Sequence, residues 1–239
     1  MRTHLALVAL LAGFTVLAAA YLLVMPPFEG PDAGGHFGYV AYLRARPCIP
    51  PLDAGTCGDS HELVQQPPLY YALAALATAG RPLTPTRALY VVNPHYGDLG
   101  YRVTATPPGD PGPALRPLRI MAGVSLLGGL LTVLATWLLA RALLPGERGL
   151  ALAAAAAVGL NPQFLAASAT ITNDTWAAAT FAWTIVCAVH AARGDGRARP
   201  WAWALVGTLA GLAALTKYGN LTVLVVLVAA LVIIALKLA

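Results

Sequence analysis

Long apolar runs separated by short polar segments make up most of this chain. Runs of roughly 20 residues, the length that a helix needs to cross a bilayer, occupy residues 5–25, 119–143, 150–170, 176–192 and 201–238. The last run is too long for one crossing and contains Lys217, whose charge is costly at mid-bilayer. The pattern therefore predicts that "LTKYGN" divides this run and that the chain crosses a membrane about six times.

The segment between the first two runs, residues 26–118, is too polar and too rich in proline to lie within a membrane. Within it, Pro31 predicts the start of a helix over residues 31–45, and an apolar stretch predicts another over residues 68–79. The second helix is too short for a crossing, which favours an interfacial or re-entrant position. The sequence "ATPPGDPGPALRP" is typical of a loop. We expect an all-α, polytopic membrane protein of one module, residues 1–239, with a large first loop.

Composition supports the membrane assignment. Hydrophobic residues make up 58% of the chain and charged residues 10%, and the mean hydropathy is +0.68. Such a chain has too few polar groups to cover the surface of a water-soluble domain. The net charge of +5 is a small excess of arginine, which in membrane proteins marks cytoplasmic loops, so we expect no nucleic-acid partner.

The arginines also predict the orientation. With Arg2 in the cytoplasm, the short loops on that side contain the arginines of residues 141–148 and 193–199, whereas the short loops on the other side contain only Lys217. This distribution follows the positive-inside rule and predicts a plasma or inner membrane protein with its large loop outside. Small residues in "LAAAY", residues 17–21, leave a cleaved signal peptide as a competing interpretation of the N-terminus.

Counting the crossings brings three polar segments to one face of the membrane. Asp32 and His36 follow the first crossing, "TITNDT" with Asp174 joins the third and fourth, and Lys217 with Tyr218 joins the fifth and sixth. Plainer interpretations exist, because an acidic residue at a helix start stabilises the helix and an Asn-Asp pair is common in turns.

Other local patterns concern the cysteines, metals and helix geometry. Cys48 and Cys57 flank "CIPPLDAGTC" in the large loop, where an oxidising compartment would allow a disulfide. His61 and Glu62 lack the second histidine of a zinc protease, and we predict no metal site from ligand spacing. Pro162 predicts a kink in the third crossing. The small residues of "GTLAG" predict a close contact between helices.

Five segments follow one another along the chain: "PPFEGPDAGGHFGYV", "HELVQQPPLYYALAAL", "LRIMAGVSLLGGLL", "NPQFLAASATITNDTWA" and "GTLAGLAALTKYGNL". In this order and spacing the set resembles the GT-C superfamily of polytopic glycosyltransferases. Within it, the chain is similar to the protein O-mannosyltransferases, the aminoarabinose transferases and related bacterial membrane proteins of unassigned function. The likeness extends over essentially the whole chain.

The resemblance implies that a sugar passes from a polyprenyl-phosphate donor to an acceptor, whether glycan, lipid or protein, at the outer face. It implies a catalytic aspartate at Asp32 and a second acidic site at Asp174. Ala33 stands where the family often has a glutamate after the aspartate. The residues expected to bind substrate are His36, Glu62, Gln66, Arg119, Asn173, Lys217 and Tyr218.

The residue types suit this chemistry. Inverting displacement of a polyprenyl phosphate needs a base for the attacking hydroxyl, for which Asp32 is the candidate. It also needs a cation beside the leaving phosphate, for which Lys217, Arg119 and His36 are candidates. Asp174 would orient the acceptor or hold a divalent cation, and no other cofactor is indicated.

Two other functions stay open. A transporter would place polar residues along several crossings, whereas these runs are nearly uniform Ala, Leu, Val and Gly, with the polar groups at one boundary. The GT-C enzymes usually have more than six crossings. The chain would then be a catalytically incomplete member of the superfamily or the N-terminal part of a longer enzyme.

Overall fold

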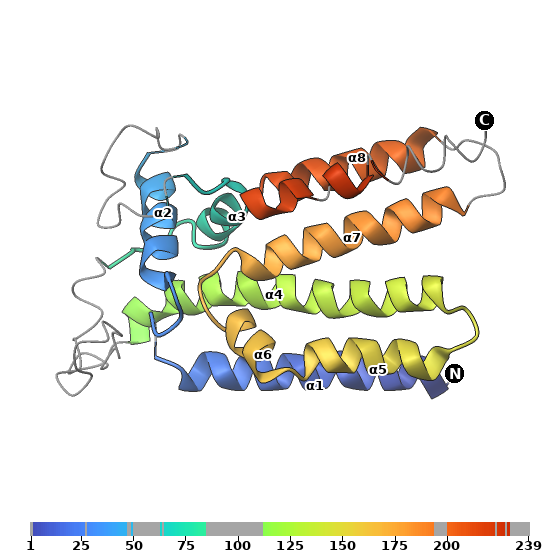
Figure 1. Ribbon diagram of the computed structural model, residues 1–239. Helices are drawn as coiled ribbons and strands as arrows, with labels where there is room; N and C mark the ends of the chain where they lie inside the picture. The colour runs from blue at the N-terminus through green and yellow to red at the C-terminus, as the bar shows by residue number, and fades with distance from the viewer. Residues whose placement is uncertain are drawn as a thin grey trace, which may run out of the picture.

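The chain folds into a bundle of helices with two short helices lying across one end (Figure 1). This computed structural model describes residues 2–26, 28–46, 49, 63, 65–84, 112–193, 200–222, 224–227 and 229. The elements along the bundle are α1 (Arg2–Val24), α4 (Gly112–Leu143), α5 (Arg148–Gly159), α6 (Pro162–Ser168), α7 (Asp174–Ala192) and α8 (Pro200–Ala214). The elements at its end are α2 (Ala33–Ala45), α3 (Leu69–Ala77) and the 3-10 turn η2 (Tyr218–Asn220).

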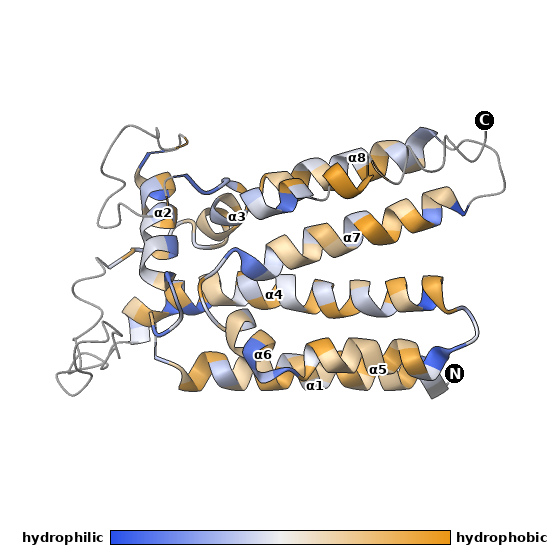
Figure 2. Ribbon diagram, in the orientation of Figure 1, coloured by the Kyte–Doolittle hydropathy of each residue, from blue (hydrophilic) through white to orange (hydrophobic). Residues whose placement is uncertain are grey.

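Three of these helices, α1, α4 and α7, are long and apolar enough to cross a membrane, and α5 with α6 makes a fourth if the pair is one broken crossing. Their apolar residues lie along the bundle and the hydrophilic ones gather near its ends (Figure 2). α8 has 15 residues and is shorter than a full crossing. The protein is therefore a membrane protein whose described part is all-helical, and the count of six crossings stays a prediction.

The third apolar run bends where the sequence predicts a kink. α5 and α6 meet at an angle of 61°. Asn161 adopts an extended backbone, the conformation that a following proline favours, and Pro162 begins α6 at a position that needs no backbone N–H donor. The Asn161 side chain accepts hydrogen bonds from the backbone N–H groups of Gln163 (2.9 Å) and Phe164 (3.3 Å), which caps the new helix.

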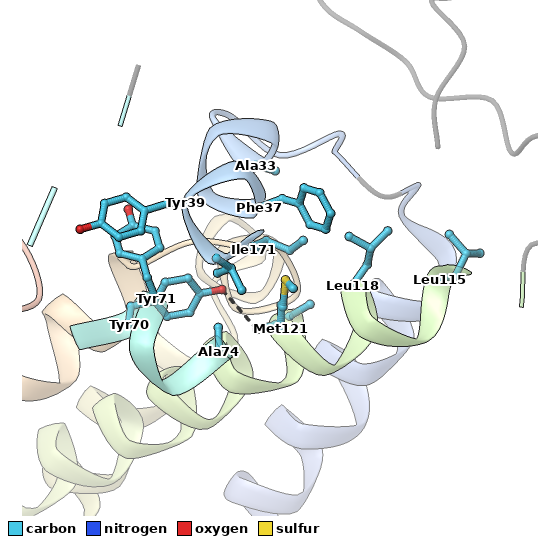
Figure 3. Packing of buried hydrophobic residues seen from close by; sticks show 12 residues of the cluster. Ala33, Phe37, Tyr39, Tyr70, Tyr71, Ala74, Leu115, Leu118, Met121 and Ile171 are labelled. Carbon is cyan, nitrogen blue, oxygen red and sulfur yellow. Dashed lines mark hydrogen bonds between the residues drawn. The ribbon is translucent and has the colours of Figure 1, made fainter. Parts of the chain in front are cut away.

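α4 begins earlier than the sequence predicts. Residues 112–117 belong to the stretch "ATPPGDPGPALRP" that we expected to be a loop, and this expectation was wrong for them, because α4 starts at Gly112. Its first turns carry Leu115 and Leu118, which pack into the cluster beneath α2 and α3 (Figure 3). Burial of these leucines favours helix despite Pro117, since tertiary packing overrides local propensity.

The apolar residues form one cluster at the end of the bundle that α2 and α3 cover, which we call the capped end, and another along the bundle. The first joins α2, α3 and the start of α4, and Figure 3 shows the rings of Tyr39, Tyr70 and Tyr71 within it. The second joins α1, α4, α5 and α6 around Phe14, which is fully buried. Because α4 contributes to both clusters and also packs along α7, it fixes the capped end relative to the bundle.

The contact between α4 and α7 depends on a glycine. A Cβ atom added at Gly128 would lie 2.9 Å from the backbone carbonyl carbon of Thr175 and 2.9 Å from Cδ1 of Trp176. Real Cβ atoms do not approach backbone this closely, so only glycine allows α7 to begin where it does. In a membrane, where the hydrophobic effect does not drive helices together, such close backbone packing is a main source of helix association.

We predict that Gly128→Ala lowers the free energy of unfolding by about 1–3 kcal/mol, because overpacking outweighs the better helix propensity of alanine. Gly123→Ala on the same helix is the matched control, since a Cβ atom there meets no atom within 4 Å. Unfolding by sodium dodecyl sulfate, followed by circular dichroism, measures both. Equal stability of the two variants would contradict the packing argument.

Candidate functional site

A pocket of about 290 Å³ and a second of about 230 Å³ adjoin at the capped end, and the second is the more polar in residue type. We call this second cavity the acidic pocket. Segments far apart in the sequence form it: the loop after α1, the start of α2, the residues before α3, α6, the α6–α7 connection with the start of α7, and Lys217, three residues after the end of α8. Its polar and charged lining residues are Glu29, Asp32, His36, Gln66, Gln163, Thr170, Thr172, Asn173, Asp174 and Lys217.

Asp174 and Lys217 form an ion pair in this pocket. The Lys217 Nζ donates to Oδ1 of Asp174 at 2.5 Å. Both side chains are partly solvated, with relative exposures of 41% for Lys217 and 54% for Asp174. A pair this exposed adds only about 0.2–1 kcal/mol to stability. Because both side chains are partly exposed, both charges are accessible to a ligand.

Asn173 ties three segments of the pocket together. Its side-chain N–H₂ donates to the backbone carbonyl of Thr216 at 2.9 Å and to Oε1 of Gln66 at 3.3 Å. The residue is 1% exposed, so these bonds form in a setting that excludes competing water. Nearby, the backbone N–H of Leu69 donates to the carbonyl of Leu215 at 2.9 Å. The start of α3 and the end of α8 are therefore held beside α7.

Asp32 occupies the N-cap position of α2 without capping it. Its side chain makes no capping hydrogen bond, and its backbone adopts the left-handed conformation with φ 57°. Aspartate tolerates this conformation better than most residues. The loop before it lies close to the α6–α7 connection, because a Cβ atom at Gly30 would come within 2.8 Å of the Thr170 methyl group. The capping interpretation therefore does not describe Asp32, which is an exposed residue lining the acidic pocket.

His36 is buried and uncharged. Burial lowers the pKa of His36 to about 4, although the carboxylates of Asp174 and Asp32 act to raise it. Its Nδ1 lies 2.9 Å from the Tyr71 hydroxyl, and its ring stacks on that of Tyr71. Burial also raises the pKa of Tyr71 above its ordinary value, so the phenol is protonated throughout the pH range in which a histidine titrates. When that hydroxyl donates to Nδ1, the imidazole proton lies on Nε2.

Ser125 of α4 connects the α6–α7 connection to the tyrosine cluster. Its hydroxyl lies 3.0 Å from the carbonyl of Thr172 and 3.1 Å from the Tyr70 hydroxyl, and it accepts from the Thr172 N–H at 3.3 Å. The Thr175 hydroxyl donates to the Ser125 carbonyl at 2.7 Å. These buried bonds fix the residues on both sides of Asp174.

The structure brings most of the expected site residues together. Asp32, His36, Gln66, Asn173, Asp174 and Lys217 all line the acidic pocket. Arg119 lines two other cavities, and Tyr218 is 53% exposed and does not line it. Glu62, Cys48 and Cys57 lie outside the described residues, so the predicted roles of Glu62 and of the disulfide stay predictions.

Sequence reasoning gave no role to Glu29 and Gln163, which also line the pocket. The sequence feature that could have identified Glu29 is its position in the same proline- and glycine-rich loop as Asp32, three residues before it. Among the described residues, no group of three or more histidine, cysteine, aspartate or glutamate side chains is placed to hold a metal ion. The carboxylates and amides of the pocket can bind hydroxyl groups, and its ammonium group can bind a phosphate. A carboxylate can also accept a proton.

A comparison with protein families matches this chain to a known family. The family model described as dolichyl-phosphate-mannose-protein mannosyltransferase matches residues 117–238, just over half of the 239-residue chain. The matched part includes Asp174 and Lys217, and the loop that carries Asp32 precedes it. Comparisons with curated proteins and with solved structures found no significant match.

We predict that acidification weakens the fold through His36. Because the pKa of this side chain is about 4 in the folded protein and 6.5 for an unperturbed histidine, the unfolded chain binds more protons between these values. The stabilising contribution is complete above pH 6.5 and is lost as the pH falls toward 4, by about 2 kcal/mol between pH 7.5 and 5. Detergent-micelle unfolding at both pH values measures this loss.

His36→Asn is the comparison for this measurement. Asparagine keeps a polar atom near the Tyr71 hydroxyl but does not titrate, so the stability of the variant should change less between pH 7.5 and 5. If the variant and the natural protein lose the same free energy over this range, His36 is not the group responsible.

Proposed function

The chain belongs to the dolichyl-phosphate-mannose-protein mannosyltransferase family, and from this premise we propose that it transfers a sugar from a polyprenyl-phosphate donor to an acceptor in the acidic pocket. Membership makes the protein a membrane glycosyltransferase of the GT-C type. The observation that supports the location is that Asp32, Asp174 and Lys217, which come from three distant segments, line one cavity at the end of the bundle. Carboxylates and amides in such a cavity can accept hydrogen bonds from sugar hydroxyls.

In the proposed reaction Asp32 is the general base. An acceptor hydroxyl attacks the anomeric carbon opposite the phosphate, the bond from that carbon to the phosphate oxygen breaks, and its electron pair leaves with the polyprenyl phosphate. The hydroxyl proton passes to the carboxylate of Asp32, and the configuration inverts. The exposure of Asp32 and the lack of a capping bond support this role, because the carboxylate is not committed to the helix.

Lys217 is the proposed cation beside the leaving phosphate. His36 is uncharged at neutral pH and Arg119 does not line the acidic pocket, so Lys217 is the better candidate of the three. Asp174 would hold the ammonium group in place through the ion pair of 2.5 Å until the donor binds. An ammonium group positioned in advance stabilises the developing phosphate charge without reorganising during the reaction.

We place the acidic pocket at the outer face of the cell membrane, with the N-terminus in the cytoplasm. The opposite end of the bundle carries Arg141, Arg148 and Arg193 near the short connections there. Arg193 donates to the backbone carbonyl of Ala142, and Arg141 donates to that of Pro145. Arginines in short loops favour the cytoplasmic side, which supports this orientation.

The interior of the bundle gives little support for a transporter. Three threonines of the interior, two buried and one partly buried, each donate to a backbone carbonyl of their own helix: Thr132 to Gly128, Thr136 to Thr132 and Thr184 to Thr180, at 2.7–2.9 Å. Polar groups that are satisfied within one helix offer little to a passing solute. The hydrogen-bonding groups of the acidic pocket instead lie at one end of the described bundle.

We predict that Asp32→Asn lowers sugar transfer by about 10²–10⁴-fold, because the amide cannot accept the proton. The assay uses membranes containing the full chain and radiolabelled polyprenyl-phosphate mannose, and follows the loss of label from the lipid extract. Glu147→Gln is the matched control, since Glu147 is an exposed acid at the opposite end of the bundle. Undiminished turnover by Asp32→Asn would remove Asp32 as the base.

The orientation predicts which end of the bundle is reached from outside the cell. In a background with Cys48, Cys57 and Cys187 replaced by serine, Asp174→Cys should react with a membrane-impermeant maleimide in intact cells. Glu147→Cys should react only after the cells are opened, because both positions are exposed but lie at opposite ends. Protection at position 174 together with labelling at position 147 would reverse the topology.

A further inference from the structure

Three arginines line a shallow hollow that is separate from the acidic pocket. The hollow has a volume of about 390 Å³ and is bounded by Arg81, Arg116, Arg119 and Ile120. Arg116 and Arg119 are three residues apart on α4 and therefore point to the same side of the helix. Arg81 comes from the turn after α3. We call this feature the arginine hollow.

Arg44 fixes the turn that carries Arg81. Its Nη1 donates to the carbonyl of Thr78 at 2.7 Å and its Nη2 donates to the carbonyl of Arg81 at 2.8 Å. The position of Arg81 near α4 is therefore set by α2, and the guanidinium of Arg44 is a fourth positive charge bound to the same turn. Positive charges gathered in this way repel one another unless an anion lies between them.

No carboxylate in the described part of the chain neutralises these arginines. The ion pair found there joins Lys217 to Asp174, in the acidic pocket. Arg81, Arg116 and Arg119 are all exposed. A guanidinium group presents a planar fork of N–H donors that matches the oxygens of a phosphate, and three of them around one hollow favour a phosphate group as ligand.

The depth of the hollow suits a lipid headgroup. α4 has 32 residues and is about 48 Å long, which exceeds the roughly 30 Å of the hydrocarbon core. Arg119 and Arg141 lie about 33 Å apart along the helix axis, so they bracket this core. Arg119 is then at the level of the headgroup phosphates, and Arg116 lies about one turn farther out.

An apolar groove continues from the hollow. The adjoining cavity of about 290 Å³ also has Arg119 in its lining, and its other lining residues include Leu22, Leu115, Leu118 and Ala122. The end of α1 borders this cavity with Leu23 and Val24, which are 63% and 81% exposed. A phosphate-binding hollow joined to an apolar groove at the membrane boundary has the shape of a phospholipid site.

We propose that Arg81, Arg116 and Arg119 bind the phosphate of an anionic phospholipid of the surrounding bilayer, with one acyl chain lying in the groove. The site is distinct from that of the sugar donor, because the acidic pocket has its own cation in Lys217 and does not include Arg119. The groove and the acidic pocket share Met25 and Thr170, so the bound lipid lies directly beside the acidic pocket. The proposal is independent of the transfer reaction.

Native mass spectrometry of the purified full chain tests this site. The protein is equilibrated with palmitoyl-oleoyl phosphatidylglycerol and, separately, with the zwitterionic phosphatidylcholine of the same chains. We expect preferential retention of the anionic lipid and a loss of about ten-fold or more in Arg116→Gln/Arg119→Gln, since each basic residue near the surface contributes substantially to binding anionic lipid. Arg148→Gln, an exposed arginine at the opposite end, should change retention less than two-fold.

Further arms of the experiment distinguish the source of the phosphate. Arg119→Lys keeps the charge but loses the fork of donors, so we expect a partial loss of lipid retention. Because this change is small, the variant tests the site even if the double variant fails to fold. The proposal is overturned if the double variant retains the anionic lipid as well as the natural protein does. It is also overturned if sn-glycerol 3-phosphate competes as well as the lipid, or if equimolar polyprenyl phosphate displaces the lipid, since the hollow would then be a free-anion site or the donor site.

Discussion

The contact between α4 and α7 is the constraint on which the acidic pocket depends. Gly128 lets the first turn of α7 approach the backbone of α4, and the Ser125 hydroxyl then reaches Thr172 on the connection before that turn. Trp176 adds a hydrogen bond of 2.7 Å from its indole N–H to the Val124 carbonyl. In an apolar surrounding, a buried polar group without a partner is costly, so this set of bonds holds one arrangement of the connection. The position of Asp174 relative to α4 follows from it.

The electrostatics of the capped end separate charged groups from neutral ones. Burial keeps His36 uncharged at neutral pH, and the buried phenols of Tyr70 and Tyr71 are neutral as well, with pKa values raised by burial. The polar atoms of these three groups bond to one another or to the backbone. The ionised side chains Asp174 and Lys217 remain where water reaches them. A largely apolar chain can therefore contain ionised side chains without the cost of burying their charge. The neutral His36 forms part of the wall of the pocket.

The apolar pattern predicted the long helices α1, α4 and α7 and the end of the bundle at which the polar segments meet, because both follow from the length and order of the apolar runs. It did not predict which glycines pack: in "GTLAG" the buried small residue is Ala210, and a Cβ atom at Gly207 or Gly211 meets no atom within 4 Å, whereas Gly128 lies against α7. The start of α4 and the burial of His36 also depend on packing between distant segments. Such contacts leave no local signal, since they arise only when the segments meet.

The bend between α5 and α6 brings apolar groups to the acidic pocket. Because α6 turns away from the axis of α5 by 61°, its residues Ala166 and Ala167 line the cavity next to Gln163 of the same helix and the carboxylates of the other segments. Methyl groups form no hydrogen bonds and offer a smooth surface for contact with carbon atoms. A pyranose ring is itself two-faced, with hydroxyl groups on some edges and a patch of C–H groups on one face. A cavity with this polarity would therefore favour one orientation of such a ring over the reverse orientation, before any bond is made or broken.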